Sequence, residues 1–202
     1  ALAPGKVQVV DASSGVTPRT GSKCLKIEGG QRAGVSVAWG TPPETDVEVT
    51  WWARVPESVV GAVGTEFNYL RMSLYGAENG DNISGGDDAL LGYGIRSATV
   101  GDGTSLTYYT NTTGWLDTGV NYTPDVWEEY RLTTDTAKGQ YTIVKNPSGA
   151  NPEVVVAGVS MIGTATNWSP VFMAAWSSSN GTNHPPVYVD DITIRSVVQL
   201  NT

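Results

Sequence analysis

Residues 127–145, WEEYRLTTDTAKGQYTIVK, contain two segments in which apolar or aromatic side chains alternate with polar ones. This two-residue period is typical of a β-strand that buries one face and exposes the other. Between the two segments, residues 133–140 include Asp, Lys and Gly, which favour a tight turn. The stretch therefore predicts an antiparallel β-hairpin.

Alternation of the same kind extends along most of the chain, and no segment shows the 3.6-residue period of an amphipathic helix. The predicted strands are residues 6–10, 22–28, 34–39, 46–55, 66–75, 90–97, 105–110, 115–120, 127–134, 140–145, 153–160, 170–178 and 187–195. Parallel neighbours need crossover connections, which are usually helices, so parallel βαβ units are excluded. We expect an all-β fold, an antiparallel two-sheet β-sandwich or jelly roll, in a single domain over residues 1–202.

The composition excludes some classes of partner. The chain has 202 residues and a formal net charge of −8. Its 12 basic residues are scattered, whereas binding to nucleic-acid phosphates requires a basic surface, so no nucleic acid is expected. No apolar stretch is long enough to span a bilayer, so no membrane partner is expected either. The single cysteine, Cys24, is expected to be a small buried side chain.

Three segments resemble concanavalin A-like jelly rolls. The hairpin WEEYRLTTDTAKGQYTIVKN has a Trp that opens a strand, an Asp-x-x-x-Gly turn and an aromatic residue at the start of the return strand. The closing VYVDDITI is similar to the last strand of these sandwiches and of jelly-roll carbohydrate-binding modules, and VVDASSGVTPRTGSKCLKIEGG is similar to their first two strands. The resemblance implies a glucanase-like sandwich of the concanavalin A-like kind.

Two adjacent aspartates, Asp190 and Asp191, interrupt the closing strand. If the isoleucines that follow them face the core, Asp190 faces inward; if the preceding valines also face inward, the strand must bulge at the aspartates. The resemblance implies a structural Ca²⁺ held by Asp190, by Asp11 or Glu28, and by carbonyl groups near residues 21–23, and oxygen ligands suit Ca²⁺. The alternative is an exposed acidic bulge that protects an edge strand.

Catalytic residues are not evident. Glu128 and Glu129 are adjacent in a strand, so they point to opposite faces and cannot flank one glycosidic bond. His184 is the only histidine, and we interpret it as a turn residue. On this fold, glucanases carry a Glu-x-Asp-x-x-Glu strand, which is absent here. Polysaccharide lyases use Arg, Gln or Asn, His and Tyr on neighbouring strands, and their motifs around the Gln and the His are missing here. Residues 68–71 supply such Asn, Tyr and Arg side chains.

Aromatic residues suggest a sugar-binding surface. The chain has seven Trp and nine Tyr but only two Phe, and the indole and phenol rings combine an apolar plate with a polar group. Alternation assigns Trp51 to the core and places other side chains on the opposite faces of their strands. If these strands are neighbours, one sheet presents a glycan-binding face of Trp52, Arg54, Tyr69, Arg71, Arg96 and Trp176. The alternative is a solvated face with scattered aromatic residues.

These observations favour a non-catalytic carbohydrate-binding domain whose partner is a polysaccharide or oligosaccharide. We expect it to be secreted, and to act as a monomer or as a module of a larger protein. A polysaccharide lyase or glycoside hydrolase on the same fold is the first alternative, and a structural or adhesion domain without a sugar site is the second.

Overall fold

The computed structural model describes residues 7–28, 33–37, 46–55, 68–76, 89–96, 104–110, 113–161, 168–175 and 186–197. For strand residues 33–37, 68–76, 89–96, 109, 114–115 and 168–175 only the backbone is described. No helix within these ranges is long and apolar enough to cross a membrane.

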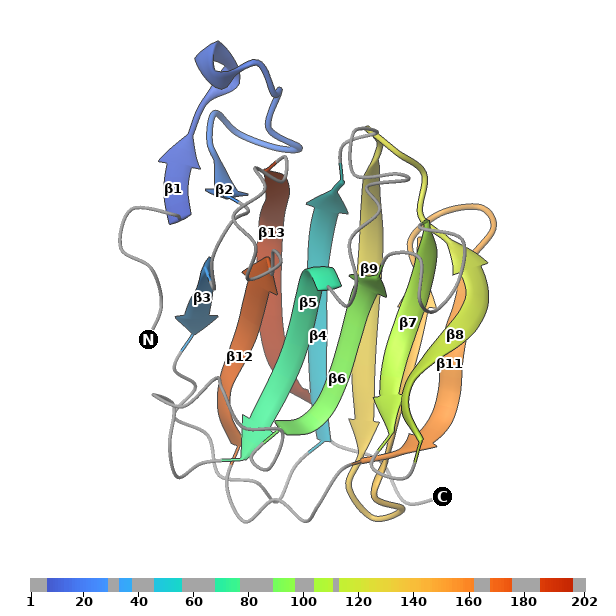
Figure 1. The fold of residues 1–202 in the computed structure, drawn as a ribbon. Helices are drawn as coiled ribbons and strands as arrows, with labels where there is room; N and C mark the ends of the chain where they lie inside the picture. The colour runs from blue at the N-terminus through green and yellow to red at the C-terminus, as the bar shows by residue number, and fades with distance from the viewer. Residues whose placement is uncertain are drawn as a thin grey trace.

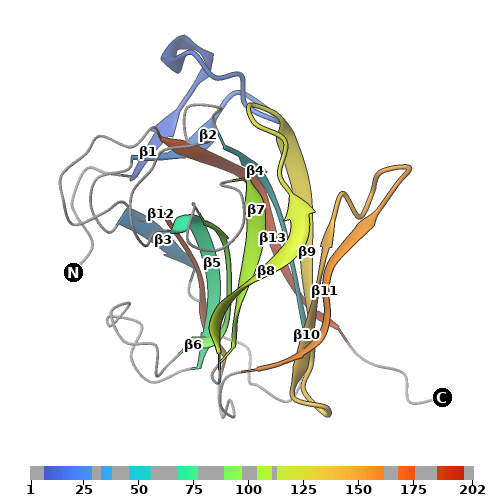
Figure 2. The ribbon, with the colours of Figure 1, turned by 45° about the vertical axis from the view of Figure 1, so that its right-hand side comes forward.

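Two antiparallel sheets face each other (Figure 1, Figure 2). The seven-stranded sheet has the order β1 (Val7–Val10), β2 (Cys24–Ile27), β13 (Val187–Val197), β4 (Asp46–Arg54), β9 (Trp127–Asp135), β10 (Gln140–Lys145) and β11 (Glu153–Ser160). The six-stranded sheet has the order β3 (Ala33–Val37), β12 (Trp168–Ala175), β5 (Asn68–Gly76), β6 (Ala89–Arg96), β7 (Ser105–Thr110) and β8 (Gly114–Asn121). Within the described residues the helical structure is one 3₁₀ turn, η1 (Ala12–Ser14). The predicted antiparallel two-sheet sandwich is confirmed.

Strands β9 and β10 form the hairpin that the sequence predicts. Their register pairs Asp135 with Gln140 at the turn and Tyr130 with Lys145 at the other end. The turn closes at Gly139, whose N–H donates to the carbonyl oxygen of Thr136 at 3.2 Å. Gly139 has φ +62°, a left-handed conformation that a residue without Cβ adopts at little cost. The glycine of the predicted turn therefore has a defined structural role.

The core lies between the sheets and takes alternate residues from each strand. On β4, Val47, Val49 and Trp51 are buried, and the Trp51 ring stacks on that of Tyr130 with centroids 5.6 Å apart. Trp52, on the opposite face of β4, is half-buried. The predicted assignment of Trp51 to the core is confirmed, and Cys24, which is 4% exposed, is buried as expected.

A β-bulge at the two aspartates keeps β13 in contact with the core on both sides of the interruption. The pairing of β13 with β4 shifts register between Asp190 and Thr193, and Asp191 has φ +49°. Val187 and Val189 are buried before the bulge, and Ile192 and Ile194 pack against the same core after it. A regular strand would turn one of these pairs to the opposite face, because one extra residue inverts the alternation.

Trp51 should contribute far more to stability than Trp52. Trp51→Ala removes a fully buried ring and is expected to lower the free energy of unfolding by about 3–5 kcal/mol. Trp52→Ala removes a half-buried ring and is expected to cost about 1–2 kcal/mol. Urea denaturation of both variants measures the difference, and equal losses would contradict the observed register of β4.

Tyr141 offers a second test of the core. Its ring is buried, its hydroxyl has no hydrogen-bond partner among the described residues, and burial raises the pKa of this phenol, so the group stays neutral. Tyr141→Phe is expected to raise the free energy of unfolding by about 1 kcal/mol, because an unpaired hydroxyl no longer has to be buried. Tyr130→Phe is the matched control. The Tyr130 hydroxyl donates to Glu128 Oε2 at 2.9 Å, so its removal should destabilise the protein. A loss of stability in Tyr141→Phe would contradict the structure.

Candidate functional site

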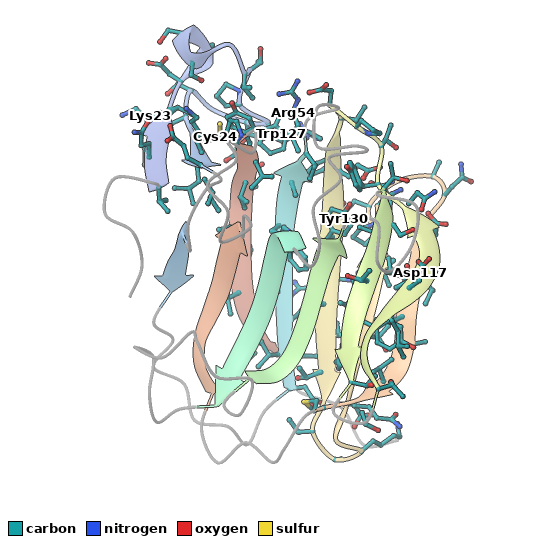
Figure 3. All side chains as sticks on the ribbon, in the orientation of Figure 1. Lys23, Cys24, Arg54, Asp117, Trp127 and Tyr130 are labelled. Carbon is teal, nitrogen blue, oxygen red and sulfur yellow. The ribbon has the colours of Figure 1, made fainter. Side chains whose placement is uncertain are left out.

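The outer face of the seven-stranded sheet carries a hollow of about 450 Å³ near the end where β4 finishes and β9 begins. We call it the upper hollow. It is lined by Arg19, Trp52, Trp127, Glu129, Asn146, Ser148, Gly149, Ala150 and Asn151. Two indole rings, a guanidinium, a carboxylate and two amides therefore converge on one surface. Figure 3 shows Trp127 with Arg54 at this end of the sheet.

The floor of the upper hollow follows from the pairing of β4 with β9. Trp52 lies opposite Glu129, and Arg54 lies opposite Trp127. Residues directly opposite each other in an antiparallel pair project from the same face, so these four share the outer face. Arg54 is not among the residues that line the hollow, and its Nη2 lies 2.7 Å from Asp125 Oδ1.

One wall of the hollow is the loop between η1 and β2. The guanidinium of Arg19 lies over the ring of Trp52, 4.1 Å from its centroid. The backbone N–H of Arg19 donates to Asp190 Oδ2 at 2.9 Å, and Trp127 Nε1 donates to the carbonyl oxygen of Thr17 at 3.0 Å. Arg19 was not predicted from the sequence, because nothing in PRTGS indicates that this loop reaches across to β4.

The opposite wall is the turn after β10. Asn146 adopts a left-handed conformation with φ +51°, and its N–H donates to the carbonyl oxygen of Glu129 at 2.7 Å. The Glu129 carboxylate accepts hydrogen bonds from the N–H and the hydroxyl of Ser148, both at 3.1 Å. Glu129 thus fixes the turn and presents negative charge at the edge of the hollow.

The predicted single glycan-binding face is wrong in one respect. Trp52 and Arg54 lie on β4 in the seven-stranded sheet, whereas Tyr69, Arg71 and Arg96 lie on β5 and β6 in the six-stranded sheet. The three strands have a similar sequence pattern, which predicted that they share one sheet. The pairing of distant segments instead places β4 in one sheet and β5 and β6 in the other.

The residues predicted on β5 and β6 lie on adjacent strands of the six-stranded sheet. Arg71 pairs with Gly94, and Asn68 pairs with Arg96, so the predicted residues of these two strands are neighbours in the backbone register. The side chains of residues 68–76 and 89–96 lie outside the described part, as does Trp176. A role for Tyr69, Arg71, Arg96 or Trp176 in ligand binding stays a prediction.

The acidic residues predicted as calcium ligands have other partners. Asp11 caps η1, where hydrogen bonds from the hydroxyl and N–H of Ser13 lower the pKa of its carboxyl group. Glu28 forms an ion pair with Lys26 at 2.9 Å. Within the described ranges no three His, Cys, Asp or Glu side chains are grouped to hold a metal ion. Asp11 and Glu28 each have a partner of their own, and calcium binding by Asp190 with either of them stays a prediction.

The two aspartates attach the loop of the upper hollow to β13. Asp190 Oδ2 accepts hydrogen bonds from the N–H groups of Arg19 and Thr20, at 2.9 and 3.4 Å. Asp191 Oδ1 accepts one from the Thr20 hydroxyl at 2.6 Å. Calcium binding by Asp190 together with backbone carbonyls stays a prediction.

The adjacent glutamates point to opposite faces, as predicted. Glu128 is 4% exposed and lies 3.1 Å from Lys145 Nζ, whereas Glu129 lies on the outer face. Lys145 also donates to the carbonyl oxygen of Asn121 at 2.5 Å. The buried pair is fully engaged in joining β9, β10 and the end of β8, and the two carboxylates cannot act on one bond.

No family model matches the chain, and no curated protein matches it. Its fold is similar to that of an endo-β-1,4-glucuronan lyase from the fungus Trichoderma reesei, at 14% identity, with 96% of this chain and 89% of that chain covered and a TM-score of 0.55. Lectin UEA-II, solved in complex with galactose, is similar at 10% identity, with 98% and 96% covered and a TM-score of 0.59. A sialidase is similar at 8% identity and a TM-score of 0.58, over 95% of this chain and only 17% of its own length. These similarities establish the concanavalin A-like jelly-roll fold.

Asp190 is expected to stabilise the loop whether or not calcium binds. Asp190→Ala should lower the free energy of unfolding by about 1–2 kcal/mol in the presence of chelator, because two backbone N–H groups lose their acceptor. Urea denaturation measures this loss. The calcium hypothesis adds that calcium should raise the melting temperature of the wild type and not that of the variant. Identical melting of the wild type in calcium and in chelator would contradict calcium binding.

Proposed function

We propose that the protein binds carbohydrate in the upper hollow and does not catalyse a reaction of it. The observation that carries this proposal is the convergence of Trp52, Trp127 and Arg19 with polar side chains in one hollow of about 450 Å³. Hollows of this size accommodate small ligands, and sites for them combine aromatic plates with a few placed polar groups. A sugar ring has both an apolar C–H face and hydroxyl groups, so it matches such a lining.

Each side chain has a distinct role in this proposal. Arg19 offers N–H donors to sugar hydroxyls and is held in position by its stacking on Trp52. Trp127 offers an indole surface next to these donors, and the amides of Asn146 and Asn151 can both donate and accept. Trp52 therefore acts chiefly by positioning Arg19, whereas the sequence alone placed Trp52 on the predicted glycan-binding face.

The arrangement of acids favours binding over hydrolysis. Among the described residues that line the upper hollow Glu129 is the only carboxylate, and both of its oxygens accept hydrogen bonds from Ser148. Hydrolysis by the common mechanisms requires two carboxyl groups that flank the scissile bond. The similarity in fold to a galactose-bound lectin supports a binding role by analogy, and an extracellular location is part of the same proposal.

The proposal is tested with soluble β-1,4-glucan, β-1,4-glucuronan, β-1,3-glucan and galactan, by affinity electrophoresis followed by titration calorimetry. We expect saturable binding to at least one of them, and a roughly tenfold loss of affinity in Arg19→Ala and in Trp52→Ala, equivalent to about 1.4 kcal/mol. Lys23→Ala is the matched control, because it removes one positive charge from the same loop and does not line the hollow.

Two outcomes would contradict the proposal. If no polysaccharide binds, or if Lys23→Ala weakens binding as much as Arg19→Ala, the upper hollow is not the binding site. Release of reducing ends or of unsaturated uronates during the same incubations would instead show an enzyme. Thermal melting of each variant establishes that a loss of binding is not a loss of folding.

A further inference from the structure

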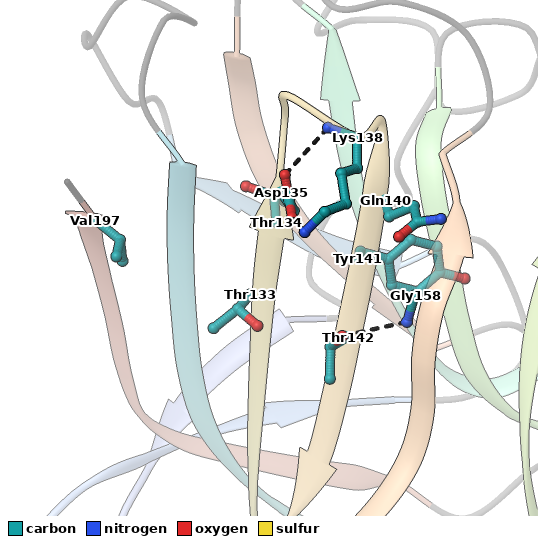
Figure 4. Close-up of a pocket in the computed structure, with 9 residues that line it drawn as sticks. All are labelled: Thr133, Thr134, Asp135, Lys138, Gln140, Tyr141, Thr142, Gly158 and Val197. Atoms are coloured by element: carbon teal, nitrogen blue, oxygen red, sulfur yellow. Dashed lines mark hydrogen bonds and ion pairs between the residues drawn. The ribbon is translucent and has the colours of Figure 1, made fainter. Parts of the chain in front are cut away.

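The same outer face carries a second hollow of about 470 Å³ at the opposite end of β9 and β10 (Figure 4). We call it the lower hollow. It is lined by Thr133, Thr134, Asp135, Lys138, Gln140, Tyr141, Thr142, Gly158 and Val197. Hydroxyl, amide and charged side chains take part in this lining, which comes from β9, β10, their turn, β11 and the end of β13.

A bulge in β11 shapes one side of the lower hollow. The pairing of β10 with β11 shifts register between Tyr141 and Ile143, and Gly158 lies in the extra segment of β11 with φ +61°. The N–H of Gly158 donates to the Thr142 hydroxyl at 3.3 Å, which is one of the dashed contacts in Figure 4. A Cβ at this position would lie 3.2 Å from Gln140 Oε1, so glycine keeps this side open.

Strand β9 joins the two hollows. Its burial alternates strictly from Trp127 to Asp135, and the half-buried residues are Trp127, Glu129, Arg131, Thr133 and Asp135. The first two line the upper hollow, and the last two line the lower one. Between them lies Arg131, opposite Thr50 on β4 and Val144 on β10. At roughly 3.3 Å per residue the row is about 26 Å long.

We propose that this row of β9 residues, with the hollow at each end, binds one extended polysaccharide chain that occupies both hollows and passes over Arg131. The inference rests on the proposed function and extends it from a sugar to a polymer. Several consecutive sugar units are needed to reach both hollows, so the protein should prefer long chains to short ones.

The chemistry of the row fits a glycan better than a protein or a lipid surface. Within the described ranges the exposed large hydrophobic residues are Val9, Val126 and Val154, and none of them lines either hollow. Within the same ranges Arg131 forms no ion pair, so its guanidinium is available to donate to hydroxyl or carboxylate oxygens. Thr133 and Gln140 add donors and acceptors in the lower hollow.

The test measures affinity against chain length with β-1,4-glucan and β-1,4-glucuronan oligosaccharides of two and of eight sugar units. We expect the wild type to bind one octasaccharide at least tenfold more tightly than the matching disaccharide. Arg131→Ala and Thr133→Val should each weaken octasaccharide binding severalfold and leave disaccharide binding unchanged, because the upper hollow is intact. Thr193→Val is the matched control. Thr193 is exposed on β13, two strands from β9, and lines neither hollow.

The outcomes separate this inference from the proposed function. If the disaccharide and the octasaccharide bind equally, and Arg19→Ala weakens the binding of both, the upper hollow is a sugar site. The inference that one extended chain occupies both hollows is then wrong. If Arg131→Ala and Thr133→Val bind the octasaccharide as the wild type does, the lower hollow takes no part and the inference is also wrong. Absence of all binding overturns both.

Discussion

Successive side chains of a β-strand point to opposite faces, and this constraint couples the core of the protein to its outer surface. In β9 every side chain that packs between the sheets has neighbours in sequence that face outward: Tyr130 stacks on Trp51, and Glu129 and Arg131 on either side of it lie on the outer face. The packing that fixes the rotation of β9 and β4 therefore also fixes which residues can meet a ligand. Outward side chains that bind a ligand along such a strand are therefore held in a row by the packing of the core alone.

The constraint also explains which parts of the structure were predictable. Alternation within one strand is a local property, so the hairpin of β9 and β10, the buried Trp51 and the outward Trp52 followed from the sequence. The division of strands between sheets is a property of pairing between segments far apart in the chain. Nothing in the pattern of residues 68–76 distinguishes a neighbour of β4 from a member of the opposite sheet, and for that reason Arg71 was wrongly grouped with Trp52.

Loops account for the other differences between prediction and structure. Adjacent aspartates in a strand mark an interruption of the alternation, and the bulge was one of the two expected outcomes. Their partners could not be predicted, because a carboxylate that binds a cation and one that accepts backbone N–H groups look alike in sequence. In the structure Asp190 receives N–H groups from Arg19 and Thr20. The same contacts accompany the placement of the Arg19 guanidinium over Trp52, so the aspartates predicted as metal ligands also help to build a wall of the upper hollow.

A regular sheet face offers a ligand little beyond a flat surface, so hollows require local departures from regularity. At the upper end, two such departures raise walls on either side of Trp52 and Glu129. One is the loop held by Asp190, and the other is the left-handed turn at Asn146. At the lower end the β11 bulge at Gly158 opens the second hollow. Between these points β9 pairs without a register shift to both of its neighbours, from Asp135 to Tyr130 on one side and from Thr133 to Trp127 on the other. The pairing of β10 with β11 also shifts register between Ile143 and Val144, but β9 itself stays regular, so its outward side chains from Trp127 to Asp135 form one continuous row. This is the geometry that an extended polymer, unlike a single sugar, can use along its whole length.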